Sequence, residues 1–149
     1  MSDDCSHVAS GIERRIERIG AYNGLSVYYD YAHHPTEIAC TVRALREATG
    51  GKVAVIFKPH TYSRTARFIT EFARALSLAD EVILCDVSGI REEAIKGVSS
   101  ERIARLIGRH AICLSDSAVA AKIDEVGADA VIIMGAASLD EVKRDIIGK

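Results

Sequence analysis

Four short apolar runs, each separated from the next by an amphipathic segment, constrain the fold of this chain most strongly. The runs are nearly continuous in apolar residues rather than alternating, and they cover Val53 to Phe57, Glu81 to Cys85, Ala111 to Leu114 and Ala130 to Met134. Such runs are typical of parallel strands that helices cover on both faces. The pattern therefore predicts an α/β fold with a mostly parallel sheet and helices on both faces.

The segments between these runs carry apolar residues at helical spacing. They predict helices over Thr36 to Ala48, Thr65 to Leu76, Ser99 to Ile107 and Asp116 to Val126, and a last helix that begins near Ser138. Upstream, the stretch from Ile12 to Arg18 alternates apolar and charged residues, and Asn23-Gly24 is a hairpin signal before a second strand, Leu25 to Tyr31. We therefore expect an antiparallel N-terminal edge strand, a tail over residues 1–10 and one domain over residues 11–149.

Composition excludes several classes of partner. The chain has 149 residues and a formal charge of −2, which does not favour binding to nucleic acid or to anionic lipid. No apolar run is long enough to span a membrane, and the polar start MSDDCSHVAS lacks the apolar stretch of a signal peptide. Three of the four cysteines lie in apolar or helical patterns, which favours buried thiols over a disulfide or a zinc site. We therefore expect a cytoplasmic protein.

Polar side chains gather after two of the predicted strands. Leu25 to Tyr31 runs into Ala32-His33-His34-Pro35-Thr36-Glu37, and Val53 to Phe57 runs into Lys58-Pro59-His60-Thr61-Tyr62-Ser63-Arg64-Thr65. Ligands of open α/β sheets bind beyond the carboxyl ends of the strands. A helix N-terminus beside Arg64 can hold a carboxylate or phosphate through exposed backbone N–H groups, and the histidines can bind a small zwitterion. Asp30 can accept hydrogen bonds from a ribose or an ammonium, so these loops suit an amino-acid or nucleotide pocket.

Two phosphate-binding motifs are absent from the sequence. There is no G-x-x-x-x-G-K-[ST] loop, since Gly51-Lys52 is followed by Val53, and no G-x-G-x-x-G follows a strand. If ATP is used, its phosphates must be held elsewhere. We therefore expect this chain to be inactive as a kinase or ligase on its own.

The segments Asp30 to Glu37 and Phe57 to Thr65 resemble the two signature loops of the alanine-adding Mur ligases, ATP-dependent enzymes of bacterial peptidoglycan synthesis. The resemblance runs from about Gly11 to Gly135, and the second loop is the more discriminating, because the first recurs in several Mur ligases and related folate ligases. It implies the Rossmann-like, amino-acid-binding third domain of a three-domain enzyme. The domains that bind the UDP-sugar and carry the P-loop would lie outside this chain.

The same resemblance implies the chemistry and the partners of the whole enzyme. ATP would phosphorylate the carboxylate of UDP-N-acetylmuramate, and the amine of L-alanine would then attack the acyl phosphate. ATP and Mg²⁺ would serve the full-length ligase, with none bound by this domain alone. The N-terminal and central ligase domains would be its protein partners.

The resemblance also assigns roles to individual residues, carried over by position. Arg15, Asp30 and Tyr31 would contact the nucleotide. His33, His60 and Arg64 would line the L-alanine site, with Arg64 holding the carboxylate. The resemblance implies no covalent nucleophile and no metal ligand. Lys58, Thr61 and the Gly135-Ala136-Ala137-Ser138 loop depart from the family pattern.

Plainer interpretations remain for these residues. His33-His34-Pro35 is also typical of a polar helix start, Arg64 of a solvated charge, and Arg15 of a charged strand face. A metal site built from His33, His34 and His60 is a further alternative, and Asp86 and Asp116 are interpreted as strand-end and N-cap groups.

Two other functions also stay open for the whole chain. One is a standalone, non-catalytic module that binds an amino acid or nucleotide. The other is the same domain of a sister Mur ligase that adds another amino acid, which the loop from His60 to Arg64 argues against.

Overall fold

The computed structural model describes residues 16–22, 24–89, 92–136 and 138–147. Within them, the strands form one six-stranded sheet in the order β1-β2-β6-β3-β4-β5. The strands are β1 (Glu17–Tyr22), β2 (Leu25–Asp30), β3 (Val53–Phe57), β4 (Glu81–Leu84), β5 (Ala111–Cys113) and β6 (Ala130–Met134). β1 pairs antiparallel with β2, and every other pairing is parallel, so the predicted mostly parallel sheet with an antiparallel edge strand is confirmed.

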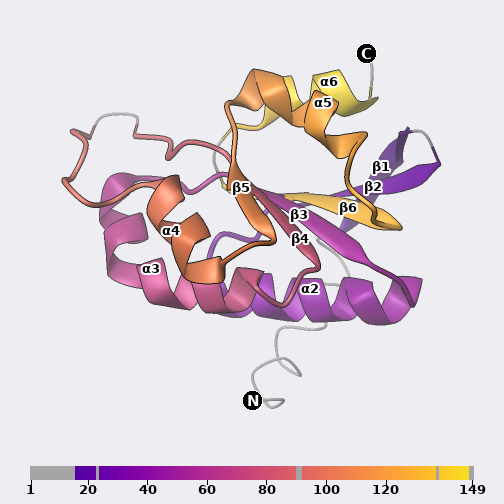
Figure 1. Ribbon diagram of the computed structural model, residues 1–149, viewed down its shortest axis with the longest axis horizontal. Coiled ribbons are helices and arrows are strands. Elements are labelled where there is room, and N and C mark those ends of the chain that lie inside the picture. Colours follow the sequence, from indigo (N-terminus) through magenta and orange to yellow (C-terminus); the bar gives the residue numbers. More distant parts are fainter. Residues whose placement is uncertain (1–15, 23, 90–91, 137, 148–149) are drawn as a thin grey trace.

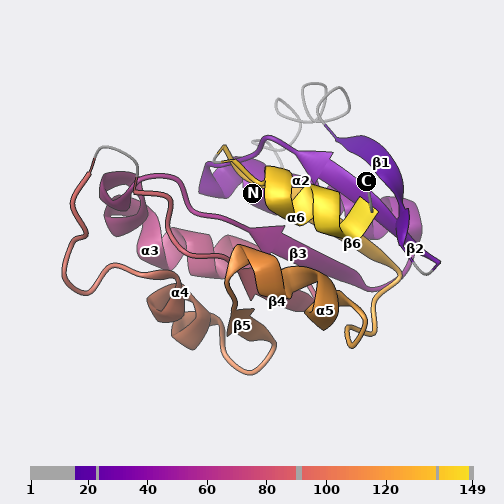
Figure 2. The ribbon, with the colours of Figure 1, turned by 90° about the horizontal axis from the view of Figure 1, so that it is seen from above.

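Helices cover both faces of this sheet (Figures 1 and 2). They are α2 (Pro35–Thr49), α3 (Tyr62–Leu76), α4 (Ser100–Ile107), α5 (Val119–Ile123) and α6 (Asp140–Ile147), with a short 3₁₀ helix η1 (Asp116–Ala118) before α5. Figure 1 shows α2, α3 and α4 below the sheet and α5 and α6 above it.

The continuous helix predicted over Asp116 to Val126 is wrong. The chain there forms η1 and the short α5, because both ends wind more tightly than an α-helix: the Ala118 N–H donates to the Ser115 carbonyl, and the Val126 N–H to the Ile123 carbonyl, each three residues back.

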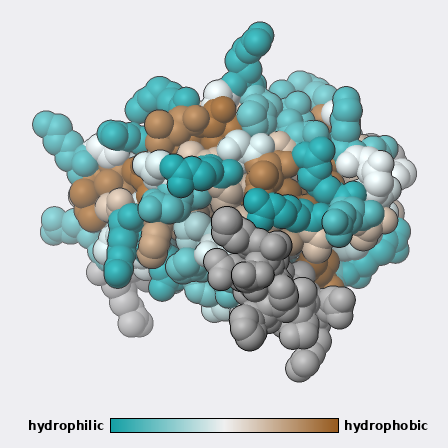
Figure 3. Space-filling view, turned by 90° about the horizontal axis from the view of Figure 1, so that it is seen from below, coloured by the Kyte–Doolittle hydropathy of each residue, from teal (hydrophilic) through white to brown (hydrophobic). Residues whose placement is uncertain are grey.

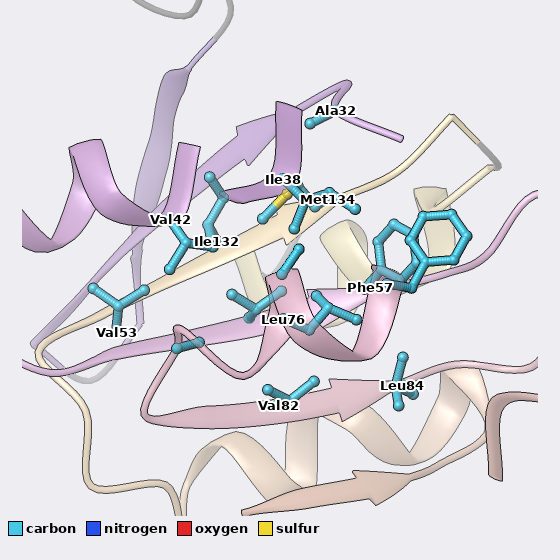
Figure 4. Close-up of a cluster of buried hydrophobic side chains, with 14 of the residues drawn as sticks. Ala32, Ile38, Val42, Val53, Phe57, Leu76, Val82, Leu84, Ile132 and Met134 are labelled. Atoms are coloured by element: carbon cyan, nitrogen blue, oxygen red, sulfur yellow. The ribbon is translucent and has the colours of Figure 1, made fainter. Parts of the chain in front are cut away.

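Alternate residues of the central strands pack against opposite helical layers. Val53, Val55 and Phe57 of β3 belong to the core between the sheet and helices α2 and α3. Ala54 and Ile56 belong to the core between the sheet and helices α5 and α6. Figure 4 shows the first of these cores, with Phe57, Leu84 and Met134 near the carboxyl ends of their strands. All residues of β3 and β6 are buried, which is why these strands read as continuous apolar runs in the sequence.

The surface of the described residues is mixed in character. Figure 3 shows hydrophobic and hydrophilic residues interspersed on the face that is seen from below. In the described part of the chain, no helix has the length and apolar character that crossing a membrane requires. Cys85 and Cys113 are free thiols, as predicted, but Cys40 is disulfide-bonded, so the thiol prediction is wrong for that residue. Spacing along a sequence does not show which sulfurs meet in space.

Candidate functional site

Three neighbouring strand ends define the candidate site. β6 lies between β2 and β3, and the Gly135 N–H donates to the Asp30 carbonyl at 3.2 Å, while the Lys58 N–H donates to the Met134 carbonyl at 3.4 Å. After β2 and β3 the chain turns to the α2 and α3 face, whereas after β6 it turns to the α6 face (Figure 2). Such a divergence is the switch point at which open α/β sheets bind ligands.

Asp30 ends β2 and points into the protein. Its side chain is fully buried, and one carboxylate oxygen accepts a 2.7 Å hydrogen bond from the Thr41 hydroxyl while the other accepts from the Ala32 N–H at 3.2 Å. Thr41 lies on α2 and is also fully buried. Asp30 therefore fixes the start of the first site loop (Asp30 to Glu37) against the helix that follows it.

Tyr31 and the partly exposed His33 contact each other in this loop. The Tyr31 side chain is 52% exposed, and its ring meets the His33 ring edge-on with centroids 5.3 Å apart. His33 Nδ1 lies 3.1 Å from the Tyr31 carbonyl oxygen. Because a carbonyl only accepts, this hydrogen bond places the proton on Nδ1 and leaves Nε2 of the neutral ring as an acceptor toward solvent or a ligand.

His34 caps α2 rather than facing a ligand. Its Nδ1 accepts from the Thr36 N–H at 3.3 Å, and the Glu37 carboxylate accepts from the His34 N–H at 3.3 Å. The two hydrogen bonds complete a capping box. The His34 ring also packs edge-on against Phe68 of α3, with centroids 5.1 Å apart. The first site loop is thereby joined to the helix that follows the second one.

The second site loop (Lys58 to Thr65) contains a strained turn at Thr61. Thr61 has φ 67° and ψ 143° and is the only non-glycine residue with positive φ in the described ranges. It forms the N-cap of α3, since its hydroxyl accepts from the Arg64 N–H at 3.2 Å. A threonine in this region of backbone space costs on the order of 1–3 kcal/mol, and such residues cluster at binding sites.

His60 and Arg64 flank this turn. His60 Nδ1 is buried and has no hydrogen-bond partner within the described part of the chain. Arg64 is partly exposed in the first turn of α3, and no carboxylate of the described residues lies within ion-pair distance of its guanidinium. A cation at a helix N-terminus is unfavourable with respect to the helix dipole, so this position favours an anionic partner.

The backbone of the α3 N-terminus already holds a carboxylate. Glu92, from the segment between β4 and α4, accepts from the Tyr62 N–H at 2.6 Å, the Ser63 N–H at 3.2 Å and the Ser63 hydroxyl at 2.7 Å. These hydrogen bonds, led by that of the Ser63 hydroxyl, lower the pKa of Glu92. The expectation of exposed N–H groups is therefore corrected: the first N–H groups of α3 are occupied by a side chain of the protein itself.

Lys58 and Asp116 form a second contact between distant loops. The Lys58 ammonium lies 2.6 Å from the Asp116 carboxylate, and each side chain is about one-fifth exposed. Asp116 is thus not the N-cap that the sequence suggested; Ser115 holds that position of η1. Burial, with Asp116 as the next cause, raises the pKa of the neighbouring Cys85 thiol to about 12.

A hollow of about 530 Å³ opens beside this ion pair. Lys58, Ser88, Asp116 and Ser138 are among the residues that line it. His33, His60 and Arg64 do not line it. The predicted amino-acid residues therefore lie outside the hollow, and sequence reasoning did not indicate it.

The structure tests the geometry of the predicted site but not its ligands. At one edge of the sheet, Asp30 ends β2, Tyr31, His33 and His60 lie on the loops after β2 and β3, and Arg64 lies in the first turn of α3. Arg15 lies outside the described residues. Across the ranges that the structure describes, no group of three or more His, Cys, Asp and Glu side chains could hold a metal ion, so the three-histidine alternative gains no support.

Sequence reasoning matched Glu92 to the family pattern but assigned no role to Glu92 or to Thr41. Glu92 contacts residues 29 and 30 positions away, and Thr41 contacts a residue 11 positions away. Thr41 reads as an ordinary helical residue, and Glu92 as one of two consecutive glutamates in a polar loop. Their roles become visible only in the structure, where the Thr41 hydroxyl contacts Asp30 and the Glu92 carboxylate contacts the start of α3.

Comparison with known proteins gives consistent matches. The model of the family described as "Mur ligase, glutamate ligase domain" matches residues 14–137. UDP-N-acetylmuramate–L-alanine ligase of Mycolicibacterium vanbaalenii is 43% identical over 146 residues, which cover 93% of this chain and 30% of that protein. The chain thus spans less than a third of the length of this curated relative.

Two solved structures share the fold. A murein peptide ligase from Psychrobacter arcticus aligns with TM-score 0.69 and 21% identity, covering 92% of this chain and 30% of that one. UDP-N-acetylmuramate-alanine ligase from Thermotoga maritima aligns with TM-score 0.62 and 24% identity, covering 87% of this chain and 28% of that one. At these identities the likeness concerns the fold alone.

Proposed function

The chain belongs to the Mur ligase family and corresponds to the C-terminal domain of these enzymes, and we propose that it binds the amino acid in an ATP-dependent ligase. This ligase would join L-alanine to UDP-N-acetylmuramate. The relative from Mycolicibacterium vanbaalenii, which bears the name of that activity, covers nearly the whole chain at 43% identity. The whole ligase would act in the bacterial cytoplasm.

The observation that carries the proposal is the position of Arg64. Arg64 lies in the first turn of α3, and its backbone N–H donates to the hydroxyl of the strained Thr61. His60 lies on the other side of Thr61, and its Nδ1 has no hydrogen-bond partner among the described residues. A guanidinium binds a carboxylate through two parallel hydrogen bonds, which orients a small amino acid as well as holding it. We propose that Arg64 holds the carboxylate of L-alanine, with His60 and His33 around the rest of the molecule.

The nucleotide role is divided between two residues of the first site loop. Tyr31 exposes an aromatic ring at the sheet edge, which fits stacking on a planar base. Asp30 does not present its carboxylate to solvent, because Thr41 and the Ala32 N–H hold it. A direct contact between Asp30 and a ribose would require the Thr41 hydrogen bond to open. We place the phosphates and Mg²⁺ with the rest of the whole ligase, since this sequence has no P-loop.

The proposed chemistry needs positioning from this domain rather than a nucleophile. The γ-phosphoryl group of ATP passes to the muramate carboxylate and ADP leaves; the neutral amine of L-alanine then attacks the acyl carbon, and phosphate leaves as the amide forms. Holding the alanine carboxylate directs the amine toward the acyl group. Such orientation lowers the barrier by removing freedom that the free reactants would have to lose.

The proposal is tested by titrating the chain with L-alanine, glycine, D-glutamate and ATP-Mg²⁺ while the histidine ring resonances are recorded. We expect L-alanine to shift the resonances of His33 and His60 weakly and more than D-glutamate does, and we expect no ATP hydrolysis. Equal responses to all three amino acids would contradict the assignment to L-alanine. Turnover of ATP by this chain alone would contradict its role as one part of a larger ligase.

A further inference from the structure

Two residues between β4 and α4, Ser88 and Glu92, form hydrogen bonds with the second site loop. The Thr61 N–H donates to the Ser88 carbonyl at 2.8 Å, and the Ser88 N–H donates to the Pro59 carbonyl at 2.8 Å. These bonds extend the parallel pairing beyond the ends of β3 and β4, as a bridge between His60 and Ser88. The backbone on both sides of His60 is therefore fixed by Ser88.

Glu92 holds the start of α3. The Glu92 N–H donates to the Gly89 carbonyl at 2.9 Å. Its carboxylate then binds the N–H groups of Tyr62 and Ser63 and the Ser63 hydroxyl. Gly89 itself lies against the Tyr62 ring so closely that a Cβ would come within 2.3 Å of a ring carbon.

The strained residue Thr61, with φ 67°, lies between the contacts that Ser88 and Glu92 make. A backbone conformation of this kind persists only where the surroundings fix it from several sides. Relaxation of the turn would move His60 on one side of it and Arg64 on the other.

We propose that Glu92 is a positioning residue of the amino-acid site, which locks the strained Thr61 turn and thereby sets the relative orientation of His60 and Arg64. The inference rests on the proposed function for its ligand. Because Glu92 occupies the N–H groups of Tyr62 and Ser63, the substrate carboxylate is left to the Arg64 guanidinium. Binding then depends on a side chain that the substrate does not touch.

The test compares Glu92→Ala and Glu92→Gln with Glu93→Ala in the same chain. Glu93 is the matched control, since it is the adjacent glutamate and is exposed. Amide resonances of Tyr62 and Ser63, the His60 ring resonances and the Arg64 Nε resonance are first recorded without ligand. The affinity for L-alanine is then measured under conditions in which each variant is fully folded, so that a change in stability alone does not alter it.

We expect Glu92→Ala to shift the His60 and Arg64 resonances without ligand and to weaken L-alanine binding roughly tenfold, less than the ~100-fold that a 1 Å misplacement can cost. Glu92→Gln, which keeps an acceptor oxygen, restores part of the affinity, and Glu93→Ala matches the wild type. Unchanged His60 and Arg64 resonances in Glu92→Ala overturn the proposal, as does tighter alanine binding, which would make Glu92 a competitor of the substrate. If the wild type does not bind L-alanine, the proposed function fails, and the ligand-free resonances still decide the positioning role.

Discussion

The hydroxyl of Thr41 donates a 2.7 Å hydrogen bond to Asp30, and both side chains are fully buried between β2 and α2. The signature aspartate of the first site loop is thus anchored by the helix that the loop leads into. A buried carboxylate that loses a donor keeps the cost of having left water, whereas an exposed one regains water as its partner. The loop geometry at the nucleotide side therefore depends on a helical threonine.

Replacing Thr41 with valine tests this anchor. Thr41→Val keeps the shape of the side chain and removes the donor, so we expect the free energy of unfolding to fall by about 1–3 kcal/mol. Thr41→Ser, which keeps the hydroxyl, is the control and should lose clearly less. The measurement is urea denaturation of each variant at neutral pH. Equal stability of the valine variant and the wild type would show that the hydrogen bond contributes nothing net.

Gly135 is the second position where the site constrains the backbone. It has φ 141°, and a Cβ built there would lie 2.9 Å from the Lys58 carbonyl oxygen. Gly135→Ala should therefore destabilise the fold by about 1–3 kcal/mol, through strain and through separation of β6 from the second site loop. Gly127→Ala, at an exposed loop position with open space around it, is the matched control. Thermal unfolding of both variants measures the difference, and similar losses would contradict the close-approach argument.

The Glu92 contact predicts a pH dependence of stability. Its hydrogen bonds with Ser63 and Tyr62 lower the pKa of Glu92 in the folded chain. A carboxyl group with a depressed folded pKa stabilises the fold above its unfolded pKa, and that stability is lost as the pH falls through the folded pKa. The difference in unfolding free energy between wild type and Glu92→Gln should thus be present at neutral pH and shrink below the ordinary range of glutamate. A difference that stays constant between neutral and strongly acidic pH would contradict an ionised Glu92.

The thiols of Cys85 and Cys113, which are free in the described part of the chain, should resist alkylation in the native protein. Burial raises the pKa of Cys85 to about 12 and that of Cys113 to about 11. Since the thiolate is the reactive form, raised pKa values keep both thiols protonated and unreactive at pH 8. Iodoacetamide labelling followed by peptide mass mapping should find both cysteines unmodified in buffer and modified in urea. Rapid native labelling of Cys85 would mean that the network with Asp116 is open to solvent.

Patterns in the sequence predicted the buried strands and the position of the candidate site loops. Val53–Phe57 and Ala130–Met134 matched the structure because strands buried on both faces must be apolar throughout. The rule that ligands bind beyond strand ends indicated the loops after β2 and β3. In the structure, His60 and Arg64 lie on either side of the Thr61 turn, and their role in binding stays a prediction.

Contacts between loops could not be predicted in this way. The Lys58–Asp116 pair spans 58 positions, and no spacing rule relates the two residues. Glu92 occupies the N–H groups at the start of α3, which the sequence analysis assigned to a ligand. Such partners are set by the topology of the sheet rather than by either loop.

The central claim, that Arg64 of this chain holds the carboxylate of L-alanine, is tested most directly by calorimetric or NMR titration of L-alanine into Arg64→Met, with Arg74→Met as control. Arg74 lies in the last turn of the same helix, far along the chain from the strained Thr61. Removal of a charged hydrogen-bond partner should weaken binding roughly 10- to 100-fold in Arg64→Met, while Arg74→Met keeps the wild-type affinity. Equal affinity of Arg64→Met and the wild type would contradict the account.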